Sequence, residues 1–138
     1  MNSKLGKIIL AGAVLGFCMT TGATAASIKE LQGAWTMDGT ECSDTFKKTG
    51  KKVEFKDRTA STSTGLLVNG SRIVSPNAAC TTGTVRKQKD RLTANLTCVD
   101  SMIEYGQTVT FKIVDSKTLQ RFDPFGDNMF ITYHKCDM

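Results

Sequence analysis

The residues with the clearest chemical role in this sequence are its cysteines. Four of them follow residue 26: Cys42, Cys80, Cys98 and Cys136. An even number of cysteines in an exported chain is typical of a disulfide framework, here with three possible connectivities. Zinc binding is the alternative, but the sequence has no C-x-x-C pair and its single His134 lies two residues from Cys136. We therefore expect two disulfides and no metal site.

The segment between Cys80 and Cys98 indicates how the cysteines pair. It has the pattern of one hairpin that turns at Lys89 and Asp90, which places Cys80 and Cys98 at matching heights on neighbouring strands. We predict the disulfides Cys80–Cys98 and Cys42–Cys136. In the chain-entropy model the shorter loop stabilises the fold by about 3 kcal/mol and the longer one by about 4.5 kcal/mol.

Catalytic groups are sparse. A hydrolase needs a nucleophile, a base and an oxyanion hole, and the sequence has no G-x-S-x-G, phosphate-binding glycine loop or H-E-x-x-H motif. His134 is expected to be a packed or rim residue of the last strand. A pair of catalytic carboxylates would have to assemble from scattered acids: Asp38, Glu41, Asp44, Asp100 and Glu104. We predict no catalytic residue, no cofactor and a protein that is not an enzyme.

Two groups of basic residues surround expected turns. The first basic cluster contains Lys47, Lys48, Lys51, Lys52, Lys56 and Arg58, and the second contains Arg86, Lys87, Lys89 and Arg91. The ordinary interpretation is that these side chains lie at a rim of the molecule, where they are exposed to water and aid solubility. The alternative is an anion-binding patch for lipopolysaccharide, acidic glycans or an acidic partner, and it requires both clusters to lie on one side of the molecule.

An apolar segment precedes the last predicted strand. Its apolar members are Phe122, Phe125, Met129 and Phe130. Apolar side chains on a loop beside a barrel mouth are able to form a recognition surface. We favour the alternative that they fold back and cap the core.

The first 26 residues have the features of a signal peptide. Lys4 and Lys7 precede the uncharged run 8–19, which is long enough for a signal sequence and too short to span a bilayer. Ala23 and Ala25 supply the small residues of a cleavage site, so we expect a cut after Ala25 or Ala26. The expected product is one domain, residues 27–138, that is periplasmic or secreted and does not span a membrane.

Charge excludes one class of partner. Removal of the predicted signal takes away Lys4 and Lys7 and lowers the formal net charge from +5 to +3. This mildly basic balance falls short of what nucleic-acid binding requires. We expect a small ligand or a protein as the partner, with an anionic envelope surface as a further possibility, and no nucleic acid.

The remaining pattern is that of an all-β protein. Short runs of β-forming residues separated by turns predict eight to ten strands, and the alternation of Leu92, Ala94, Leu96 and Cys98 places these four on one face. Asn69-Gly70 predicts a tight hairpin turn. Residues 27–32 suggest one helical turn capped by Ser27, residues 42–48 a strand or an irregular piece, and residues 123–128 a loop. We predict an antiparallel up-and-down barrel or a sandwich with two disulfides.

The segment Leu31-Gln32-Gly33-Ala34-Trp35 resembles the opening of the lipocalin-like (calycin) barrels, in which a short helical turn precedes L-x-G-x-W. The resemblance covers about five residues and the strand layout. It implies that Trp35 fills the barrel floor, that Gly33 allows close backbone approach, and that an arginine covers the tryptophan. Arg121 is the nearest candidate for that arginine.

The same opening is similar to that of the Inh-type periplasmic inhibitors of metalloproteases and of small exported alphaproteobacterial proteins of unknown role. In the Inh-type inhibitors the N-terminal strand is inhibitory, and it would correspond to residues 26–29 here. Our leading expectation is a non-enzymatic binding module with a ligand pocket in the barrel mouth, opposite Trp35. The alternatives are an inhibitor of a protease or other hydrolase, and an envelope structural protein.

Overall fold

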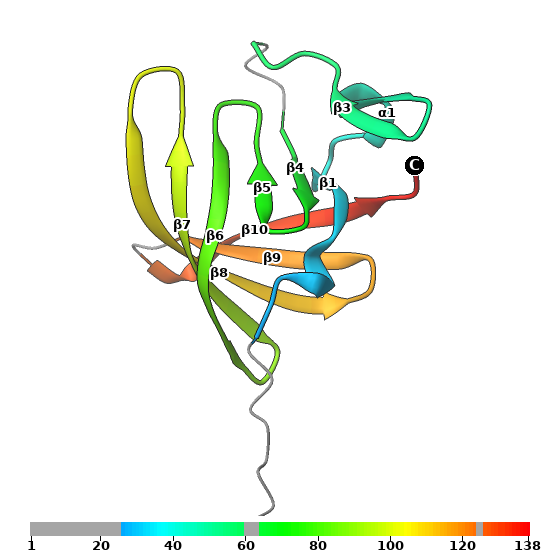
Figure 1. The fold of residues 1–138 in the computed structure, drawn as a ribbon. Helices are drawn as coiled ribbons and strands as arrows, with labels where there is room; N and C mark the ends of the chain where they lie inside the picture. Colours follow the sequence, from blue (N-terminus) through cyan, green and yellow to red (C-terminus); the bar gives the residue numbers. More distant parts are fainter. Residues whose placement is uncertain (1–25, 60–63, 124–125) are drawn as a thin grey trace, which may run out of the picture.

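The computed structural model describes residues 26–59, 64–123 and 126–138, so nearly all of the predicted signal segment lies outside it. Within these residues the chain forms ten strands and two short helices (Figure 1). After a 3-10 helix (Lys29–Leu31) come β1 (Gly33–Met37), α1 (Cys42–Thr45), β2 (Phe46–Thr49), β3 (Lys52–Phe55), β4 (Leu66–Asn69), β5 (Arg72–Val74), β6 (Ala79–Gln88), β7 (Arg91–Val99), β8 (Glu104–Asp115), β9 (Thr118–Asp123) and β10 (Gly126–Cys136).

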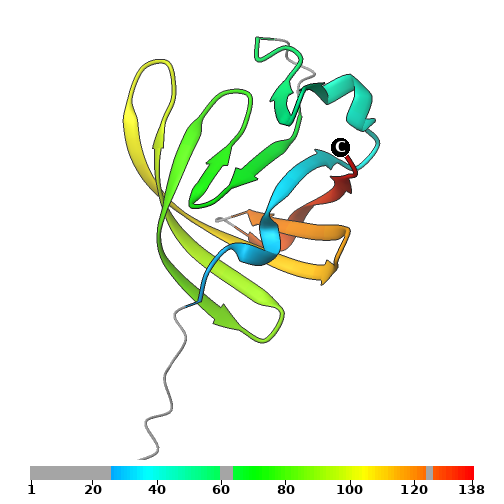
Figure 2. The same ribbon diagram turned by 45° about the vertical axis from the view of Figure 1, so that its right-hand side comes forward.

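Eight of these strands close into an antiparallel up-and-down barrel. Strands β4 to β10 pair in chain order, and β1 completes the ring by pairing with β10 on one side and with β4 on the other. Figure 2 shows β1 (cyan) alongside β10 (red). The predicted barrel is therefore confirmed and the sandwich alternative is wrong. Among the described residues, no helix has the length and apolar character of a membrane-spanning segment.

One end of the barrel is filled by the N-terminal residues and Trp35. The 3-10 helix brings Leu31 into the core, and the Trp35 indole Nε1 donates a hydrogen bond to the Leu31 carbonyl oxygen at 2.7 Å. The Trp35 side chain is only 1% exposed. We call this end of the barrel, with Trp35 and the 3-10 helix, the floor, and the opposite end the mouth.

A lysine covers Trp35, where the family resemblance suggested Arg121. Lys135 is the direct partner of Trp35 across β1 and β10, so the two side chains share a face, and the Lys135 Nζ lies 5.4 Å from the ring centroid. The aliphatic stem of Lys135 also explains Gly33. Gly33 has a φ of +120°, and a Cβ on it would lie 3.1 Å from Lys135 Cε.

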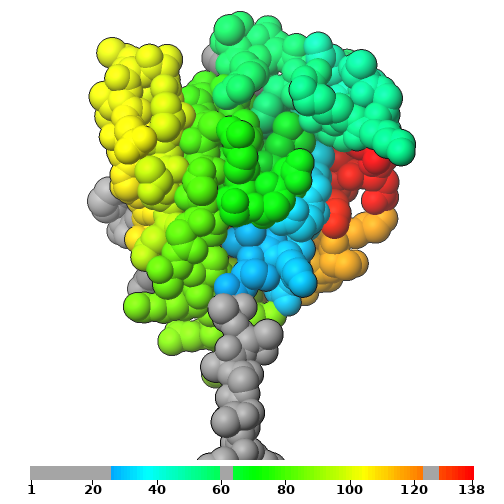
Figure 3. All heavy atoms as spheres, in the orientation of Figure 1, coloured from blue at the N-terminus to red at the C-terminus, as the bar shows by residue number. Residues whose placement is uncertain are grey.

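The hairpin β2–β3 forms a second, smaller core on the outside of the barrel wall. Phe46 and Phe55 stack at 5.0 Å between ring centroids and are buried with Ala34 and Cys136. In Figure 3 the segment that holds this hairpin forms a lobe next to the end of β10 (red). The part of the chain between β1 and β4 therefore supports the barrel from outside.

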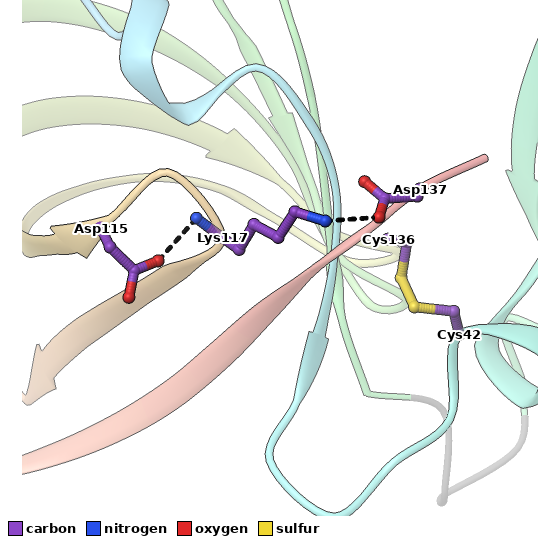
Figure 4. A network of polar contacts seen from close by, with 5 residues as sticks. All are labelled: Cys42, Asp115, Lys117, Cys136 and Asp137. Atoms are coloured by element: carbon purple, nitrogen blue, oxygen red, sulfur yellow. Dashed lines mark hydrogen bonds and ion pairs between the residues drawn. A yellow bond between two sulfur atoms is a disulfide. The ribbon is translucent and has the colours of Figure 1, made fainter.

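Both predicted disulfides are present. Cys80 and Cys98 are direct partners of β6 and β7, and their bridge lies in the barrel core. Cys42 of α1 bonds to Cys136 at the end of β10. Figure 4 shows how the end of β10 is held from both sides: by this disulfide, and by the ion pair between Lys117 Nζ and Asp137 at 2.7 Å. A hydrogen bond from the Lys135 N–H to the Lys117 carbonyl oxygen joins the same two segments.

Three local predictions differ from the structure. Residues 126–128, predicted as part of a loop over 123–128, belong to β10: Gly126 pairs with Asp123, and a bulge follows before Phe130 pairs with Phe122. The segment 42–48 is divided between the four-residue helix α1 and β2. Ser27 caps no helix: the 3-10 helix has Ile28 at its N-cap and no side-chain cap hydrogen bond.

Gly65 is predicted to be essential to the contact between the two cores. Its φ is +154°, and an added Cβ would lie 2.9 Å from the Trp35 carbonyl oxygen and 3.0 Å from Phe46 Cζ. Gly65→Ala should lower the free energy of unfolding by about 2–4 kcal/mol, from backbone strain and overpacking. Urea unfolding followed by circular dichroism measures this.

Gly83→Ala is the matched control. Gly83 lies in β6 and is exposed, and the nearest atom to an added Cβ is the Asn95 carbonyl oxygen at 3.4 Å. Its stability should change by no more than about 0.5 kcal/mol. Equal stability of the two variants would contradict this role of Gly65.

Candidate functional site

A cavity of about 170 Å³ opens at the barrel mouth; Trp35 does not line it, although its cross-strand partner Leu66 does. It is bounded by inward-facing residues of β4 to β9 and of the 75–78 connection. The apolar part of its wall consists of Leu66, Ile73, Ala78, Cys80, Leu96, Val109 and Phe111. Its polar part consists of Ser75, Asn77, Tyr105, Gln107 and Arg121. An apolar cavity with a few polar groups is the usual form of a small-molecule site.

The cavity exists because the strands are of unequal length at the mouth. Strand β9 pairs with β8 only from Thr110 onward, so residues 104–109 of β8 pair with β7 alone. Likewise, the contact of β10 with β1 ends at the hydrogen bond from the Asp38 N–H to the Thr132 carbonyl oxygen, so Ile131 pairs only with β9. The mouth is therefore open along the side of the barrel that β9 and β10 form.

Arg121 is the charged group of this site. It lies in β9 with Phe111 directly opposite on β8 and Ile131 directly opposite on β10. The side chain is half-buried, and no hydrogen bond or ion pair joins it to any residue that the structure describes. Its guanidinium has five donor N–H groups and no acceptor, so it is suited to binding an anion.

Gln107 and a disulfide form another part of the wall. The Gln107 Nε2 donates to Cys98 Sγ at 3.1 Å and lies 3.9 Å from Cys80 Sγ. The Cys80–Cys98 bridge therefore sets the position of the Gln107 amide at the cavity. Tyr105, two residues earlier in β8, lies further toward the mouth on the same face and is half-buried.

The rim of the mouth is held by local hydrogen bonds. Arg58 Nε donates to the Pro76 carbonyl oxygen at 3.1 Å, and the Ser75 N–H donates to the Ala78 carbonyl oxygen at 2.9 Å. On the β7–β8 connection, Asp100 Oδ1 accepts hydrogen bonds from the N–H groups of Met102 and Ile103. These bonds, from Ile103 first and Met102 second, hold the pKa of Asp100 below its usual value.

The same connection presents apolar side chains to solvent. Met102 is 87% exposed and Ile103 is 60% exposed, and Val99 at the end of β7 is also exposed. Single exposed apolar residues are ordinary. Three of them on a connection with a fixed turn form a candidate protein-contact surface, which we call the 99–103 loop.

The two basic clusters are far apart. The first surrounds β2 and β3 at the upper right of Figure 1, and the second surrounds the β6–β7 turn at the bottom. They do not form one patch, which the anion-surface hypothesis required. Some of their charges are neutralised by ion pairs: Lys52 binds Glu54, and Lys87 binds Glu30.

The first basic cluster borders a groove of its own. Lys51 and Lys52 face Arg72 across a space of about 700 Å³ between the β2–β3 hairpin and the outer face of β4 and β5. The apolar residues Val53, Leu67 and Val74 also line this groove.

Three of the four apolar residues of the segment 122–130 lie in strands: Phe122 in β9, and Met129 and Phe130 in β10. Phe122 is buried and packs against Phe130, with 5.7 Å between ring centroids, and the Arg91 guanidinium lies 4.3 Å above the Phe122 ring. Met129 and Phe130 are exposed. Phe125 lies outside the described residues.

His134 lies beside one of the candidate acids at the surface. His134 Nε2 lies 3.1 Å from Asp38 Oδ1, and both side chains are exposed. Within the described ranges, no three His, Cys, Asp or Glu residues come together as metal ligands. The pKa of Asp100 is lowered, whereas a general acid needs it raised.

Comparison with known protein families, with characterised proteins and with solved structures finds no match to this chain. The structure establishes the closed eight-stranded barrel and leaves the family open. The site must therefore be interpreted from its own residues.

Sequence reasoning did not connect Arg121 with the mouth, although a signal was present. Leu119 and Arg121 share a face of β9, and Leu119 is buried in the core, so a cation was predictable on an inward face. Tyr105 and Gln107 share a face with Val109 and Phe111 in the same way. What the sequence does not show is how far each strand extends at the mouth.

We predict that the 99–103 loop loosens at acid pH. The pKa of Asp100 is lower in the folded state, so the loop hydrogen bonds contribute above the ordinary aspartate value and are lost as the pH falls through the folded pKa. NMR amide shifts of Met102 and Ile103 should move as the pH falls below the ordinary aspartate pKa of about 3.9.

Two controls accompany this titration. Asp100→Asn should remove the pH dependence, since its oxygen is not ionisable. The Gly70 N–H, which donates to the neutral Gln32 amide oxygen, should not respond to pH. Shifts at Met102 and Ile103 that stay constant to pH 2 would contradict the role of Asp100.

Proposed function

We propose that this protein is a non-enzymatic binding protein, periplasmic or secreted, that holds a small ligand in its barrel mouth. The observation that supports the proposal is the cavity of about 170 Å³ with an apolar wall and a few polar groups. An eight-stranded barrel has an interior just wide enough to be filled by side chains or to hold one small ligand. Here the floor is filled and the mouth is not.

The disulfides support the proposed location. Cys42–Cys136 and Cys80–Cys98 indicate an oxidising environment outside the cytoplasm.

Filling the cavity should abolish ligand binding. Ala78 lines the cavity, and Ala78→Leu would place extra apolar atoms inside it. Ala79→Leu is the control, because Ala79 lines a groove on the other side of the same segment. Native mass spectrometry of protein purified from its own host should show a bound mass in the wild type and in Ala79→Leu. That mass should be absent from Ala78→Leu.

Circular dichroism and thermal unfolding establish that each variant is folded. A wild-type protein that carries no mass and takes up no small organic probe would refute the proposal. Retention of the ligand by folded Ala78→Leu would place the ligand elsewhere.

A second candidate function is inhibition of a protease or other hydrolase, and the 99–103 loop favours it. The loop is exposed, apolar and braced by Asp100, and a preorganised loop reduces the entropy cost of binding. The N-terminal mode of the Inh-type inhibitors has less support. Ile28 is buried in the core, so a cut after Ala25 or Ala26 leaves at most Ala26 and Ser27 free.

Inhibition assays distinguish the two modes. With subtilisin, trypsin and thermolysin as test proteases, Met102→Asp should abolish inhibition, because it places a charge in the apolar contact. Val114→Asp, at an exposed residue of β8, should leave inhibition unchanged. No inhibition by the wild type, or inhibition that survives Met102→Asp, would count against this loop. Loss of inhibition on removal of Ala26 and Ser27 would assign the N-terminal mode instead.

A further inference from the structure

We propose that the ligand of the mouth cavity is a small organic carboxylate with a short apolar tail, and that Arg121 binds its carboxylate. This inference rests on the proposed binding function and names the class of ligand. It follows from the charge, the partners and the size of the cavity.

Charge is the first argument. Among the described residues that line the cavity, Arg121 is the only one that carries a charge, and none is acidic. Its direct neighbours on β8 and β10, Phe111 and Ile131, are apolar and offer no acceptor. The guanidinium therefore has no internal partner there. Among these described lining residues, an anion that enters the cavity meets one cation and no repelling carboxylate.

The second argument is the free-energy cost of partly burying a cation that has no described partner. Arg121 is half-buried against an apolar wall and forms no side-chain hydrogen bond or ion pair with a described residue. A cation in such a place loses part of its hydration without gaining a partner. Arginine and carboxylate form two parallel hydrogen bonds, and a ligand carboxylate would supply the missing acceptors.

The remaining polar groups fit the same ligand. Tyr105 has a hydroxyl that is able to donate a hydrogen bond, and Asn77 and Ser75 lie at the rim of the cavity. The rest of the wall is apolar, with Leu66, Leu96 and Val109 available to an alkyl or aryl tail. The carboxylate would bind Arg121, and the tail would lie against the apolar wall.

Size restricts the ligand further. A cavity of about 170 Å³ is close in size to an apolar protein cavity of roughly 150 Å³ that binds benzene, a six-carbon molecule. Below it the barrel is filled by core side chains, including the buried Leu92 and Trp35. A six-carbon acid therefore matches the cavity, whereas a long-chain fatty acid exceeds it.

Titration of isotopically labelled protein tests this inference, with NMR shifts as the readout. The probes are hexanoate, hexanamide as its neutral counterpart, hexyl phosphate and palmitate. Hexanoate should shift the amides of Tyr105 and Gln107 and bind at least tenfold more tightly than hexanamide. It should also bind more tightly than hexyl phosphate and palmitate.

Arg121→Met tests the role of the guanidinium. It keeps an unbranched side chain without the charge, and it should weaken hexanoate binding at least tenfold and remove the preference for hexanoate over hexanamide. Arg91→Met is the control, because Arg91 lies over Phe122 at a separate position and does not line the cavity. Its hexanoate affinity should match that of the wild type. The comparison of hexanoate with hexanamide in the wild type does not depend on any variant folding.

The outcomes separate this inference from the proposed function. If hexanamide binds as tightly as hexanoate, or if folded Arg121→Met keeps full affinity for hexanoate, the cavity binds ligands but does not recognise their negative charge. If hexyl phosphate binds more tightly than hexanoate, the preferred ligand is not a carboxylate. If palmitate binds more tightly than hexanoate, the proposed limit on ligand size is wrong. If the host-purified protein carries a ligand but hexanoate does not bind, the inference fails and the proposed function stands.

Discussion

The structure depends on closure of the barrel through its first strand. β1 has five residues, yet it pairs with β10 on one side and β4 on the other, and only three residue pairs join it to β4. So few residue pairs form few hydrogen bonds, which alone would hold β1 and β4 together only weakly. The chain reinforces this contact with packing and a covalent bond: Trp35 fills the floor on the inner face, the Phe46–Phe55 pair belongs to the core outside, and Cys42–Cys136 ties the end of β10 to the same region. Since closure also removes the edges of β1, the hairpin and the disulfide protect the strand that would otherwise be exposed to unwanted pairing.

Closure at the floor leaves the mouth with a different character. Where every strand has two neighbours, inward side chains meet and fill the interior, as Trp35, Leu92 and Leu119 do with exposures of 1%, 0% and 1%. Toward the mouth, β8 extends past the end of β9, and β10 extends past the end of β1. Inward residues there lack a facing partner, and Ile131 remains 40% exposed although it lies opposite Arg121. The same alternation of residues thus produces a packed core at one end and an open cavity at the other.

Much of this fold was predictable from local pattern. The alternation in 92–98 placed Leu92, Ala94, Leu96 and Cys98 on the inner face, and the matching heights of Cys80 and Cys98 gave the disulfide pairing. Features that depend on register between distant segments were not predictable. Lys135 covers Trp35 because these residues are partners across strands a hundred residues apart in sequence, which no motif around Trp35 reveals. The sequence pattern of residues 123–128 predicts a loop, but pairing with β9 extends β10 back to Gly126 through a bulge. The cavity itself depends on the ends of several strands, and strand ends are the least certain part of a sequence pattern.

The position of Arg121 favours the proposed binding site over an imperfectly packed core. A barrel that served only as a structural unit would be more stable with an apolar residue there, since a half-buried cation without a partner loses hydration and gains nothing in return. Its neighbours Phe111 and Ile131 would pack readily against such a residue. A cation at this position, facing a cavity without a described acid in its wall, conflicts with the local rule that inward positions are apolar. Such conflicts are expected where a protein binds something, because the group that is unfavourable in the free protein becomes favourable in the complex.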